Sequence, residues 1–390
     1  MKRIQDTPDL SGKKVYVRVT YNVPMDDGKI VDNERIVSSL ETINYLLDHN
    51  AAIILVSHLG RPDGVVDAKL SLKPMAKELG NLIKKSVQFV PDCVGDARDK
   101  AVAEAKDGDV LLLENTRFYK EEMANDSLFS QKLARGCDLY VNDAFPDSHR
   151  EHASVVGVAA YLPAYGGFAL QREVDNLTRL IEKAEKPFVF ISGGAKVSDK
   201  LGILNNMLDK VDTLLVGGGM ANTFLCSQRV EVGCSVYEDD YMKEANEIVQ
   251  AARVRGVKIV MPEDVVVTKA IADNARGLTV PVGEVGDLDI IVDLGEKTVA
   301  AFEREILTAK TIYWNGSLGI TEYPNFAKAT QAIGAAIARS GAFSAIGGGD
   351  TTAALSDSVK DQFSFVSMAG GASMEFLEGK SLPGVKILDN

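Results

Sequence analysis

Short runs of β-branched and aliphatic residues recur along the chain, and each is followed by a longer polar or amphipathic segment. Runs that are hydrophobic almost throughout are typical of parallel strands buried on both faces, and their alternation with longer segments indicates βα units. The runs are Val15–Val19, Ala52–Ser57, Val110–Leu113, Leu139–Asn142, Pro187–Ser192, Thr213–Val216, Val257–Val260, Thr311–Asn315, Phe343–Ile346 and Phe363–Ser367. We therefore predict an α/β protein built on parallel sheets.

The runs fall into two series, separated by a segment with helical spacing of its apolar residues. Phe168–Lys183 has glycines before it and Pro187 after it, so we expect a helix that connects two domains. A chain of 390 residues exceeds the size at which one hydrophobic core stops growing. The fold predicted is two doubly wound α/β domains joined by this helix.

The charge balance limits the partners that such a protein can have. The formal net charge is −12, which disfavours nonspecific binding to nucleic acid or to anionic membranes. We see no signal peptide and no membrane span, and the cysteines have neither C-x-x-C nor zinc spacing. We expect a cytoplasmic protein with reduced cysteines, no metal held by cysteine, and small molecules as its partners.

Small-residue turns follow strands of the second series and precede predicted helices. In an open α/β sheet these turns border the ligand crevice, and helix N-termini favour anions, phosphate above all. A single turn of this kind would indicate only a sharp bend, whereas a set of them predicts a nucleotide domain. Neither the Walker pattern nor G-x-G-x-x-G is present, so the phosphate site is of another type. The turns are Gly193–Lys196, Gly217–Gly219, Gly347–Asp350 and Ala369–Gly371.

Three charged residues in these turns or just after them are candidates for contacts with phosphate. Lys196 and Lys200 are four residues apart, which would place both on one face of a helix that starts at the glycine turn. A solvated helix face explains the same spacing equally well. Asp350 is expected at a helix N-cap, and it could instead hold Mg²⁺.

Basic residues gather at predicted strand ends in the first half of this acidic chain. If they converge they form an anion pocket, and the planar fork of arginine suits phosphate or carboxylate. Taken singly, each arginine is more often a surface residue. A metal at His149 and His152 is not expected, because no suitable third ligand is near in the sequence. The basic residues are Arg18, Arg35, His58, Arg61, Arg117, His149 and Arg150.

Read in order, the motifs resemble those of phosphoglycerate kinases over essentially the whole chain. The first half has V-R-V-T-Y-N-V-P at Val17–Pro24, S-H-L-G-R-P at Ser57–Pro62, E-N-T-R-F at Glu114–Phe118 and N-D-A-F-P-D-S-H-R-E-H-A-S at Asn142–Ser154. The second half has G-G-A-K-V-S-D-K at Gly193–Lys200, G-G-G-M-A-N-T-F at Gly217–Phe224, W-N-G at Trp314–Gly316, G-G-G-D-T at Gly347–Thr351 and G-G-A-S-M-E-F-L-E-G-K at Gly370–Lys380.

The resemblance implies a two-lobed kinase with a hinge, which transfers a phosphoryl group between 1,3-bisphosphoglycerate and ADP, with Mg²⁺, to give 3-phosphoglycerate and ATP. It implies a monomer with an acid-substrate domain at 1–166, a helix at 167–184, a nucleotide domain at 185–376 and a tail at 377–390 that returns to the first domain. Implied contacts to the acid substrate are Thr20, Asn22, Arg35, His58, Leu59, Gly60, Arg61, Arg117 and Arg150. Implied contacts to the nucleotide are Lys200, Gly295, Asn315, Glu322, Gly348, Gly349, Asp350 and Thr351, with Asp350 at the metal. Arg35, Lys196, Gly348 and Gly371 would act in catalysis, with Arg35 and Lys196 flanking the transferring phosphoryl.

The chain departs from the family pattern at both implied sites. The family reads R-V-D-F-N-V-P, whereas Thr20 and Tyr21 stand here in place of D-F, and a lost charged hydrogen bond costs roughly 1.5–3 kcal/mol. Pro146 replaces a usual glycine, and its fixed φ could redirect the loop. At the nucleotide site the departures are Glu296, Ser317, Leu318, Met368 and Ala369, of which Ala369 would be strained if its φ were positive.

Three alternatives to an active kinase of this specificity follow from the departures. The first is a weakened or repurposed member that serves as a binding or scaffold protein. The second is a kinase with a changed acceptor, caused by Thr20 and Pro146. The third is a nucleotide-binding module without transferase activity, which the basic cluster of the first half argues against.

Overall fold

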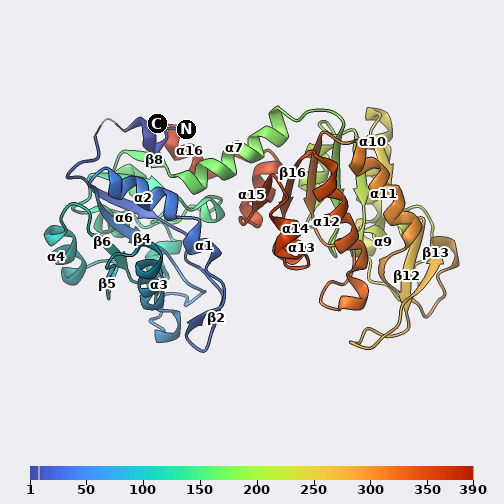
Figure 1. The fold of residues 1–390 in the computed structure, drawn as a ribbon, viewed down its shortest axis with the longest axis horizontal. Coiled ribbons are helices and arrows are strands. Elements are labelled where there is room, and N and C mark those ends of the chain that lie inside the picture. Colours follow the sequence, from blue (N-terminus) through green and yellow to red (C-terminus); the bar gives the residue numbers. More distant parts are fainter. Residues whose placement is uncertain (8, 390) are drawn as a thin grey trace. The chain divides into compact units, whose positions relative to one another are not determined.

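The computed structural model describes residues 1–7 and 9–389, which form two compact units, each with its own hydrophobic core (Figure 1). The first unit comprises Met1–Asp175 and Ser381–Asn390, and the second comprises Asn176–Lys380. Residues 377–380, which we expected in the tail, belong to the second unit, and Asn390 lies outside the described residues. None of the described helices has the length and apolarity of a membrane span.

The first unit is built on a parallel sheet of strand order β5-β6-β4-β1-β7-β8. The first strand, β1, lies in the middle of the sheet, with β4 on one side of it and β7 on the other. A doubly wound sheet binds its ligand at the carboxyl ends of the strands where the order reverses, which here are β1, β4 and β7. The strands are β1 (Lys14–Arg18), β4 (Ala52–Val56), β5 (Gln88–Val90), β6 (Val110–Leu113), β7 (Leu139–Asn142) and β8 (Ala164–Gly166), with a hairpin of β2 (Met25–Asp26) and β3 (Lys29–Ile30).

The helices of this unit bury apolar faces that their sequences set at helical spacing. For example, α6 starts where the Asp126 carboxylate accepts the amide proton of Phe129 at 2.8 Å, and it buries Phe129 and Leu133. The helices are α1 (Glu34–Val37), α2 (Leu40–Asp48), α3 (Lys73–Ile83), α4 (Asp96–Glu104), α5 (Lys120–Met123), α6 (Ser127–Ala134) and α16 (Pro383–Lys386). The 3₁₀ turns are η1 (Ile4–Asp6), η2 (Ala68–Leu70), η3 (Thr116–Phe118), η4 (Phe145–Asp147), η5 (Gly157–Ala160) and η9 (Ile387–Asp389).

The second unit repeats this plan with the strand order β11-β10-β9-β15-β16-β17, again all parallel. The order reverses at β9, between β10 and β15. A separate antiparallel sheet, β13-β12-β14, is formed by the part of the chain between β11 and β15. The strands are β9 (Phe188–Ser192), β10 (Thr213–Val216), β11 (Lys258–Val260), β12 (Asp264–Thr268), β13 (Leu278–Pro281), β14 (Ile290–Leu294), β15 (Thr311–Asn315), β16 (Phe343–Gly347) and β17 (Phe365–Ser367). The helices are α8 (Leu201–Met207), α9 (Gly218–Ser227), α10 (Met242–Arg255), α11 (Glu296–Thr308), α12 (Lys328–Ser340), α13 (Gly349–Ala353), α14 (Asp357–Lys360) and α15 (Gly371–Leu377), with η6 (Asp239–Tyr241), η7 (Val282–Glu284) and η8 (Pro324–Phe326).

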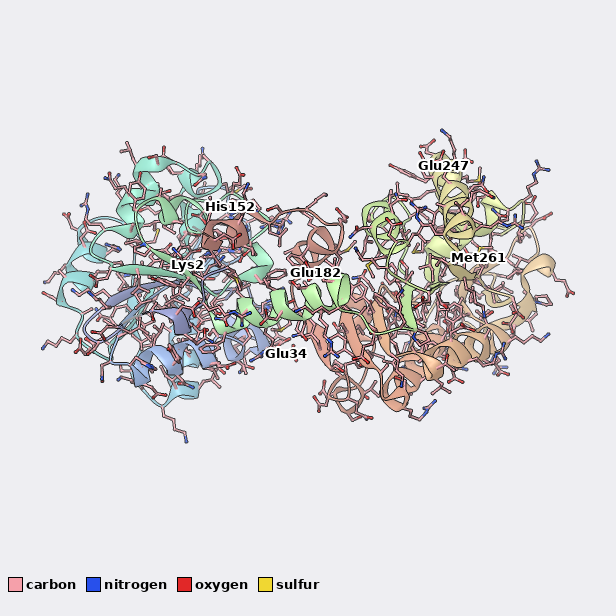
Figure 2. The ribbon with its side chains drawn as sticks, turned by 90° about the horizontal axis from the view of Figure 1, so that it is seen from above. Lys2, Glu34, His152, Glu182, Glu247 and Met261 are labelled. Carbon is pink, nitrogen blue, oxygen red and sulfur yellow. The ribbon has the colours of Figure 1, made fainter. Side chains whose placement is uncertain are left out.

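Both sheets confirm the predicted α/β class, and every hydrophobic run named above overlaps a strand. Helix α7 (Phe168–Glu182) occupies the segment in which we expected a helix, and its last residue, Glu182, is labelled in Figure 2. The two compact units divide within α7, between Asp175 and Asn176.

A buried carboxylate holds the first turn of α7. Asp143 follows β7, and its Oδ1 accepts the amide proton of Ala169 at 2.9 Å, while the hydroxyl of Thr42 accepts that of Phe168. The other oxygen of Asp143 has no hydrogen-bond partner among the described residues. Burial raises the pKa of Asp143 to about 7, although Thr42 and the amides at the start of the helix oppose the rise.

The raised pKa of Asp143 predicts that the hydrogen-exchange protection of the first turn of α7 decreases as the pH rises. A carboxyl group whose pKa is higher in the folded state favours folding most below its unfolded pKa, near 4, and that contribution is lost as the pH rises through about 7. The change amounts to about 2–4 kcal/mol between pH 4 and pH 8. Asp143→Asn keeps an acceptor for Ala169 and should flatten the profile. Hydrogen-exchange protection of the Ala169 amide at pH 4 and pH 8 measures this change. An equal dependence of protection on pH in the native protein and in Asp143→Asn would contradict the raised pKa of Asp143.

The last described residues complete the first unit. The amide of Lys2 donates to the carbonyl of Leu388 at 2.7 Å, and the amino group of Met1 pairs with Asp389 at 2.6 Å. Further along, the amide of Gly384 donates to the carbonyl of Ser148 at 2.8 Å. The two ends of the described chain therefore meet beside β8, and α16 packs against the loop that follows β7.

Candidate active site

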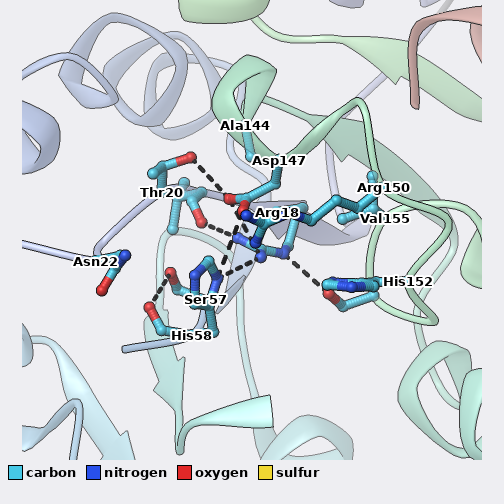
Figure 3. Close-up of polar contacts among 12 residues, drawn as sticks. Arg18, Thr20, Asn22, Ser57, His58, Ala144, Asp147, Arg150, His152 and Val155 are labelled. Carbon is cyan, nitrogen blue, oxygen red and sulfur yellow. Dashed lines mark hydrogen bonds and ion pairs between the residues drawn. The ribbon is translucent and has the colours of Figure 1, made fainter. Parts of the chain in front are cut away.

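The basic residues of the first unit meet at the carboxyl ends of the strands where the sheet order reverses. Arg18 is the last residue of β1, His58 follows β4, and Asp147 lies in η4 after β7. The guanidinium of Arg18 donates to Nδ1 of His58 at 2.9 Å and pairs with the carboxylate of Asp147 at 3.4 Å (Figure 3). It also donates to the hydroxyl of Ser154 at 2.9 Å, and its side chain is completely buried. We call this group, with Thr20, Arg117 and Arg150, the acid site.

The charges of the acid site fix the protonation of its members. Burial lowers the pKa of His58 to about 3, with Asp147 opposing the shift and Arg18 adding to it, so this imidazole is neutral at physiological pH. Because Arg18 can only donate, Nδ1 of His58 accepts and the ring proton is on Nε2. Burial alone would raise the pKa of Asp147, but the positive charges of Arg18, Arg117 and Arg150 hold it well below its usual range.

Arg117 brings an unused donor to the acid site. It lies in η3, which begins where the side chain of Asn115 accepts the amide proton of Arg117 at 3.0 Å. Its NH1 donates to the carbonyl of Gly60 at 2.8 Å, whereas its buried Nε has no hydrogen-bond partner among the described residues. Burial lowers its pKa to about 10. A buried cation with a free donor favours a bound anion.

Asn22 joins Arg35 to the turn after β4. Its side-chain oxygen accepts the amide proton of Gly60 at 2.9 Å, and its carbonyl accepts from the guanidinium of Arg35. Gly60 has φ +65°, where a side chain would also meet Leu70 at 2.8 Å. Leu59 packs in the core, so it can offer only backbone to a ligand, and Arg61 is exposed.

Two departures from the family pattern have clear places in this unit. Tyr21 is buried in the core, and its hydroxyl bonds to that of Ser39 at 2.9 Å. Pro146 lies in the first turn of η4, where its fixed φ is compatible with a helical turn. Arg150 and His149 lie beside each other beyond η4, with 3.2 Å between Nε of Arg150 and Nε2 of His149.

The glycine turns of the second unit lie at the carboxyl ends of its central strands. Gly194, Gly218, Gly316 and Gly348 all have positive φ, and they follow β9, β10, β15 and β16. A Cβ on Gly218 would lie 2.7 Å from the amide nitrogen of Gly194, so these turns approach each other too closely for side chains. In the turn Ala369–Gly371 the positive φ belongs to Gly370, and Ala369 is therefore not strained.

The prediction that Lys196 and Lys200 share a helix face is wrong. Helix α8 begins only at Leu201, and residues 194–200 form a loop. The carboxylate of Glu238 organises this loop by accepting the amide and hydroxyl protons of Ser198, at 3.0 and 2.6 Å. Lys196 is consequently exposed, whereas Lys200 is buried with its Nζ 3.4 Å from the carbonyl oxygen of Asn315. Burial lowers the pKa of Lys200 to about 8.

A cavity of about 280 Å³ opens beside the turns. One part of it is apolar and is lined by Val236, Val265, Ile271, Ile290 and Leu318. The remainder is lined by backbone of Gly194 and Gly218 and by the carboxylates of Glu322 and Asp350. An apolar slot next to glycine turns fits a planar base with a phosphate chain.

Other predicted nucleotide residues cluster next to this cavity. The hydroxyl of Thr351 accepts the amide proton of Gly316 at 3.0 Å, and the side chain of Asn315 lies against Gly348. Gly295 is different. The carboxylate of Asp264 caps α11 by accepting the amide protons of Lys297 and Thr298, which leaves Gly295 buried and outside the cavity lining.

The surroundings of Asp350 can be tested against Mg²⁺. Gly348, and not Asp350 as predicted, is the N-cap of α13, because the positive φ that the turn requires falls on the glycine. Asp350 is exposed and lines the cavity, and its carboxylate has no hydrogen bond or ion pair with the described residues, although its backbone carbonyl accepts from the amide of Ala354. No group of three or more candidate metal ligands occurs among the residues that the structure describes. One carboxylate combined with substrate phosphates is the usual way in which proteins hold Mg²⁺, so Asp350 fits this cation.

A larger cavity, of about 630 Å³, lies away from the glycine turns. It is bounded by α11, α12 and the loop before β13, and charged residues of both signs line it, among them Arg276, Glu296, Glu303 and Lys328. Glu296 lines this cavity and not the one beside the turns, so that departure does not alter the smaller cavity.

Comparisons with known proteins agree along the whole chain. The family model "Phosphoglycerate kinase" matches residues 4–380. The chain is 48% identical to the phosphoglycerate kinase of Dictyoglomus turgidum over 98% of this chain and 97% of the relative, and 47% identical to that of Moorella thermoacetica over 97% of each. Its fold matches the phosphoglycerate kinase structure from Coxiella burnetii with a TM-score of 0.91, 39% identity and coverage of 99% and 98% of the two chains. The corresponding values for the structure from Pyrococcus horikoshii are 0.86, 29%, 100% and 98%. The chain therefore belongs to the phosphoglycerate kinase family.

Proposed function

We propose that the protein catalyses reversible phosphoryl transfer between 1,3-bisphosphoglycerate and ADP, giving 3-phosphoglycerate and ATP. The observation that carries this proposal is the buried basic acid site, in which Arg117 keeps an unpartnered donor. A small molecule with a phosphate and a carboxylate suits such a site. The cavity beside the glycine turns supports the nucleotide role of the second unit.

The reaction needs no general base, because a carboxylate and a phosphate are both already ionised acceptors. In agreement with this, His58 is neutral and is held by Arg18 as a hydrogen-bond acceptor. We assign to Arg35 and Lys196 the neutralisation of charge on the transferring phosphoryl group, and to the amides of Gly348 and Gly371 further hydrogen bonds to it. Positioning and charge neutralisation then account for catalysis.

We propose that Thr20, Asn22, His58, Gly60 and Arg61, with backbone of Leu59, hold the acid substrate together with Arg117 and Arg150. Lys200, Asn315, Glu322, Gly349 and Thr351 would hold ATP or ADP, and we include Gly295 in this set although it does not line the cavity beside the glycine turns. Asp350 would hold Mg²⁺, which when bound neutralises charge on the nucleotide phosphates. We further propose a monomeric, cytoplasmic enzyme that binds no nucleic acid.

The direct test is Mg²⁺-dependent formation of ADP from ATP by the purified protein, with and without 3-phosphoglycerate. We expect turnover that depends on the acid and that is lost in Arg35→Met purified in parallel, which controls for a contaminating host enzyme. Turnover that is independent of the acid, or equal in the two proteins, would refute the proposal. A protein that binds both ligands without turnover would be a binding or scaffold protein instead.

The lowered pKa of Lys200 predicts proton uptake when nucleotide binds. At pH 8.5 the buried amine is largely neutral, because its pKa is about 8, and a bound phosphate favours the charged form. ADP affinity should therefore fall as the pH rises above 8. Calorimetry in two buffers of different ionisation enthalpy measures the uptake directly. Lys200→Arg, which stays charged, should show none, and equal heats for the native protein in both buffers at pH 8.5 would exclude this role.

A further inference from the structure

A carboxylate stands among the cations of the acid site, at a place where the sequence motifs did not lead us to expect one. Asp147 is 3% exposed, and its Oδ2 lies 3.4 Å from the guanidinium of Arg18. The other oxygen, Oδ1, lies 3.7 Å from Nδ1 of His58. The same Oδ2 accepts the hydroxyl proton of Thr20 at 3.2 Å, so the two side chains face each other directly (Figure 3).

This contact decides what Thr20 can offer to a ligand. A threonine hydroxyl has one proton to donate and two lone pairs to accept with. The ionised carboxylate of Asp147 can only accept, and therefore it takes the proton of Thr20. The oxygen of Thr20 is left as an acceptor with a negative charge directly behind it. The family pattern has aspartate at position 20, which is likewise an acceptor.

The ligand group that can use such an acceptor follows from chemistry. The phosphate and carboxylate of phosphoglycerate are acceptors, and they belong with the arginines. Its 2-hydroxyl is the remaining donor. The 2-hydroxyl group is therefore the one group of this class of substrate that can donate a hydrogen bond to Thr20.

We propose that Asp147 is a positioning residue that acts through Thr20 to make the acid site select phospho-acids carrying a 2-hydroxyl group. This inference rests on the proposed function and adds the residue that sets its substrate specificity. The pair Thr20–Asp147 replaces a single aspartate at position 20, with the charge moved across one hydrogen bond. Threonine in place of the family's aspartate at position 20 therefore does not simply remove a carboxylate from the site.

A purely structural role for Asp147 predicts something different. If the carboxylate served only to balance the buried Arg18, its loss would lower stability and would affect substrates with and without the hydroxyl group alike. Arg18 also contacts His58 and Ser154, which do not depend on Asp147. The preference for a substrate with the 2-hydroxyl group over one without it therefore distinguishes a role of Asp147 in specificity from a purely structural one.

The experiment compares 3-phosphoglycerate with 3-phosphooxypropanoate, which lacks the 2-hydroxyl group. For each acid we would measure kcat and KM, together with the KM for ATP and the melting temperature. Thr20→Val is nearly isosteric and leaves the Arg18–Asp147 pair in place. It should lower the preference for the hydroxylated acid roughly 10- to 100-fold, the effect of a charge-assisted hydrogen bond, with the KM for ATP unchanged. Asp147→Asn should lower it in the same direction.

The decisive variant exchanges the two side chains. Thr20→Asp alone places two carboxylates side by side and should weaken binding of both acids, whereas Thr20→Asp combined with Asp147→Thr should restore the preference of the native protein. Calorimetric titration of the two acids without nucleotide gives the same ratio, so failure of the kinase activity would not prevent the test. A folded Asp147→Asn or Thr20→Val variant that keeps the native preference within twofold would overturn the proposal, as would an exchange variant without rescue.

Discussion

Replacing Arg35 by methionine should lower kcat roughly 10³-fold, because arginine contacts to a transferring phosphoryl group have effects of this size. Arg35 lies half-buried in α1, and its guanidinium donates to the carbonyl of Asn22. Methionine keeps the apolar stem but removes the charge and the donors. The stability should change by less than about 0.5 kcal/mol, since the residue is not part of the core.

Two further variants make the measurement specific. Arg35→Lys retains a charge without the planar fork and should recover only part of the lost rate. Arg253→Met removes an exposed arginine of α10, in the second unit, and should leave kcat unchanged. Steady-state rates with both substrates saturating decide the matter. An Arg35→Met enzyme that retains more than a tenth of the native kcat would exclude a direct role in the transfer.

Gly316→Ala should destabilise the second unit by about 3 kcal/mol and abolish nucleotide binding. The residue has φ +98°, and a Cβ there would lie 2.3 Å from the backbone carbon of Gly193. Neither strand end can move freely, because β9 and β15 are paired up to this point. The amide of Gly316 also donates to the hydroxyl of Thr351, so a shift of Gly316 would disturb the glycine turn before Thr351 as well.

The fluorescence of Trp314 reports on this unit alone. It is the single tryptophan of the chain, it is completely buried, and its indole N–H donates to the carbonyl of Gly316 at 2.8 Å. Urea titrations followed by this signal give the change in the unit's free energy of unfolding. Gly283→Ala is the matched control, since it has an ordinary φ and nothing within 4 Å of the added methyl group. Equal midpoints for the two variants would show that the turn relaxes without cost.

The sequence was sufficient to predict the parallel sheets, because strands buried on both faces leave continuous hydrophobic runs. Among the strands that escaped prediction, β5 and β13 lack this signature, whereas β12 and β14 carry short hydrophobic runs that were overlooked. The edge strand Gln88–Val90 is short and partly exposed, and Leu278–Pro281 is exposed along most of its length. The latter belongs to the antiparallel sheet, for which a half-polar pattern is normal, and this sheet was not predicted.

The candidate site was predictable to the extent that it depends on strand ends. Arginine and histidine after buried strands indicated the acid site, and glycines after others indicated the phosphate turns. Asp147 was missed because its role depends on burial and on a contact with Thr20, which is 127 residues away in sequence. A signal was nevertheless available, since an arginine at the end of a buried strand needs a counter-charge. The placement of Lys196 failed because Glu238, distant in sequence, holds its loop out of the helix.

The return of the chain to the first unit has a consequence for its biosynthesis. The ribosome makes the segment that contains Gly384 and Leu388 only after the entire second unit. Until that segment emerges, the carbonyl of Ser148 lacks the amide of Gly384, and the side chain of Asn142 lacks the carbonyl of Gly384 that it contacts at 2.8 Å. The second unit is continuous in sequence and can complete its folding while translation proceeds. The acid site, although most of its residues are made first, is finished last, and a nascent chain halted at Lys380 should remain open to proteases around residues 142–154.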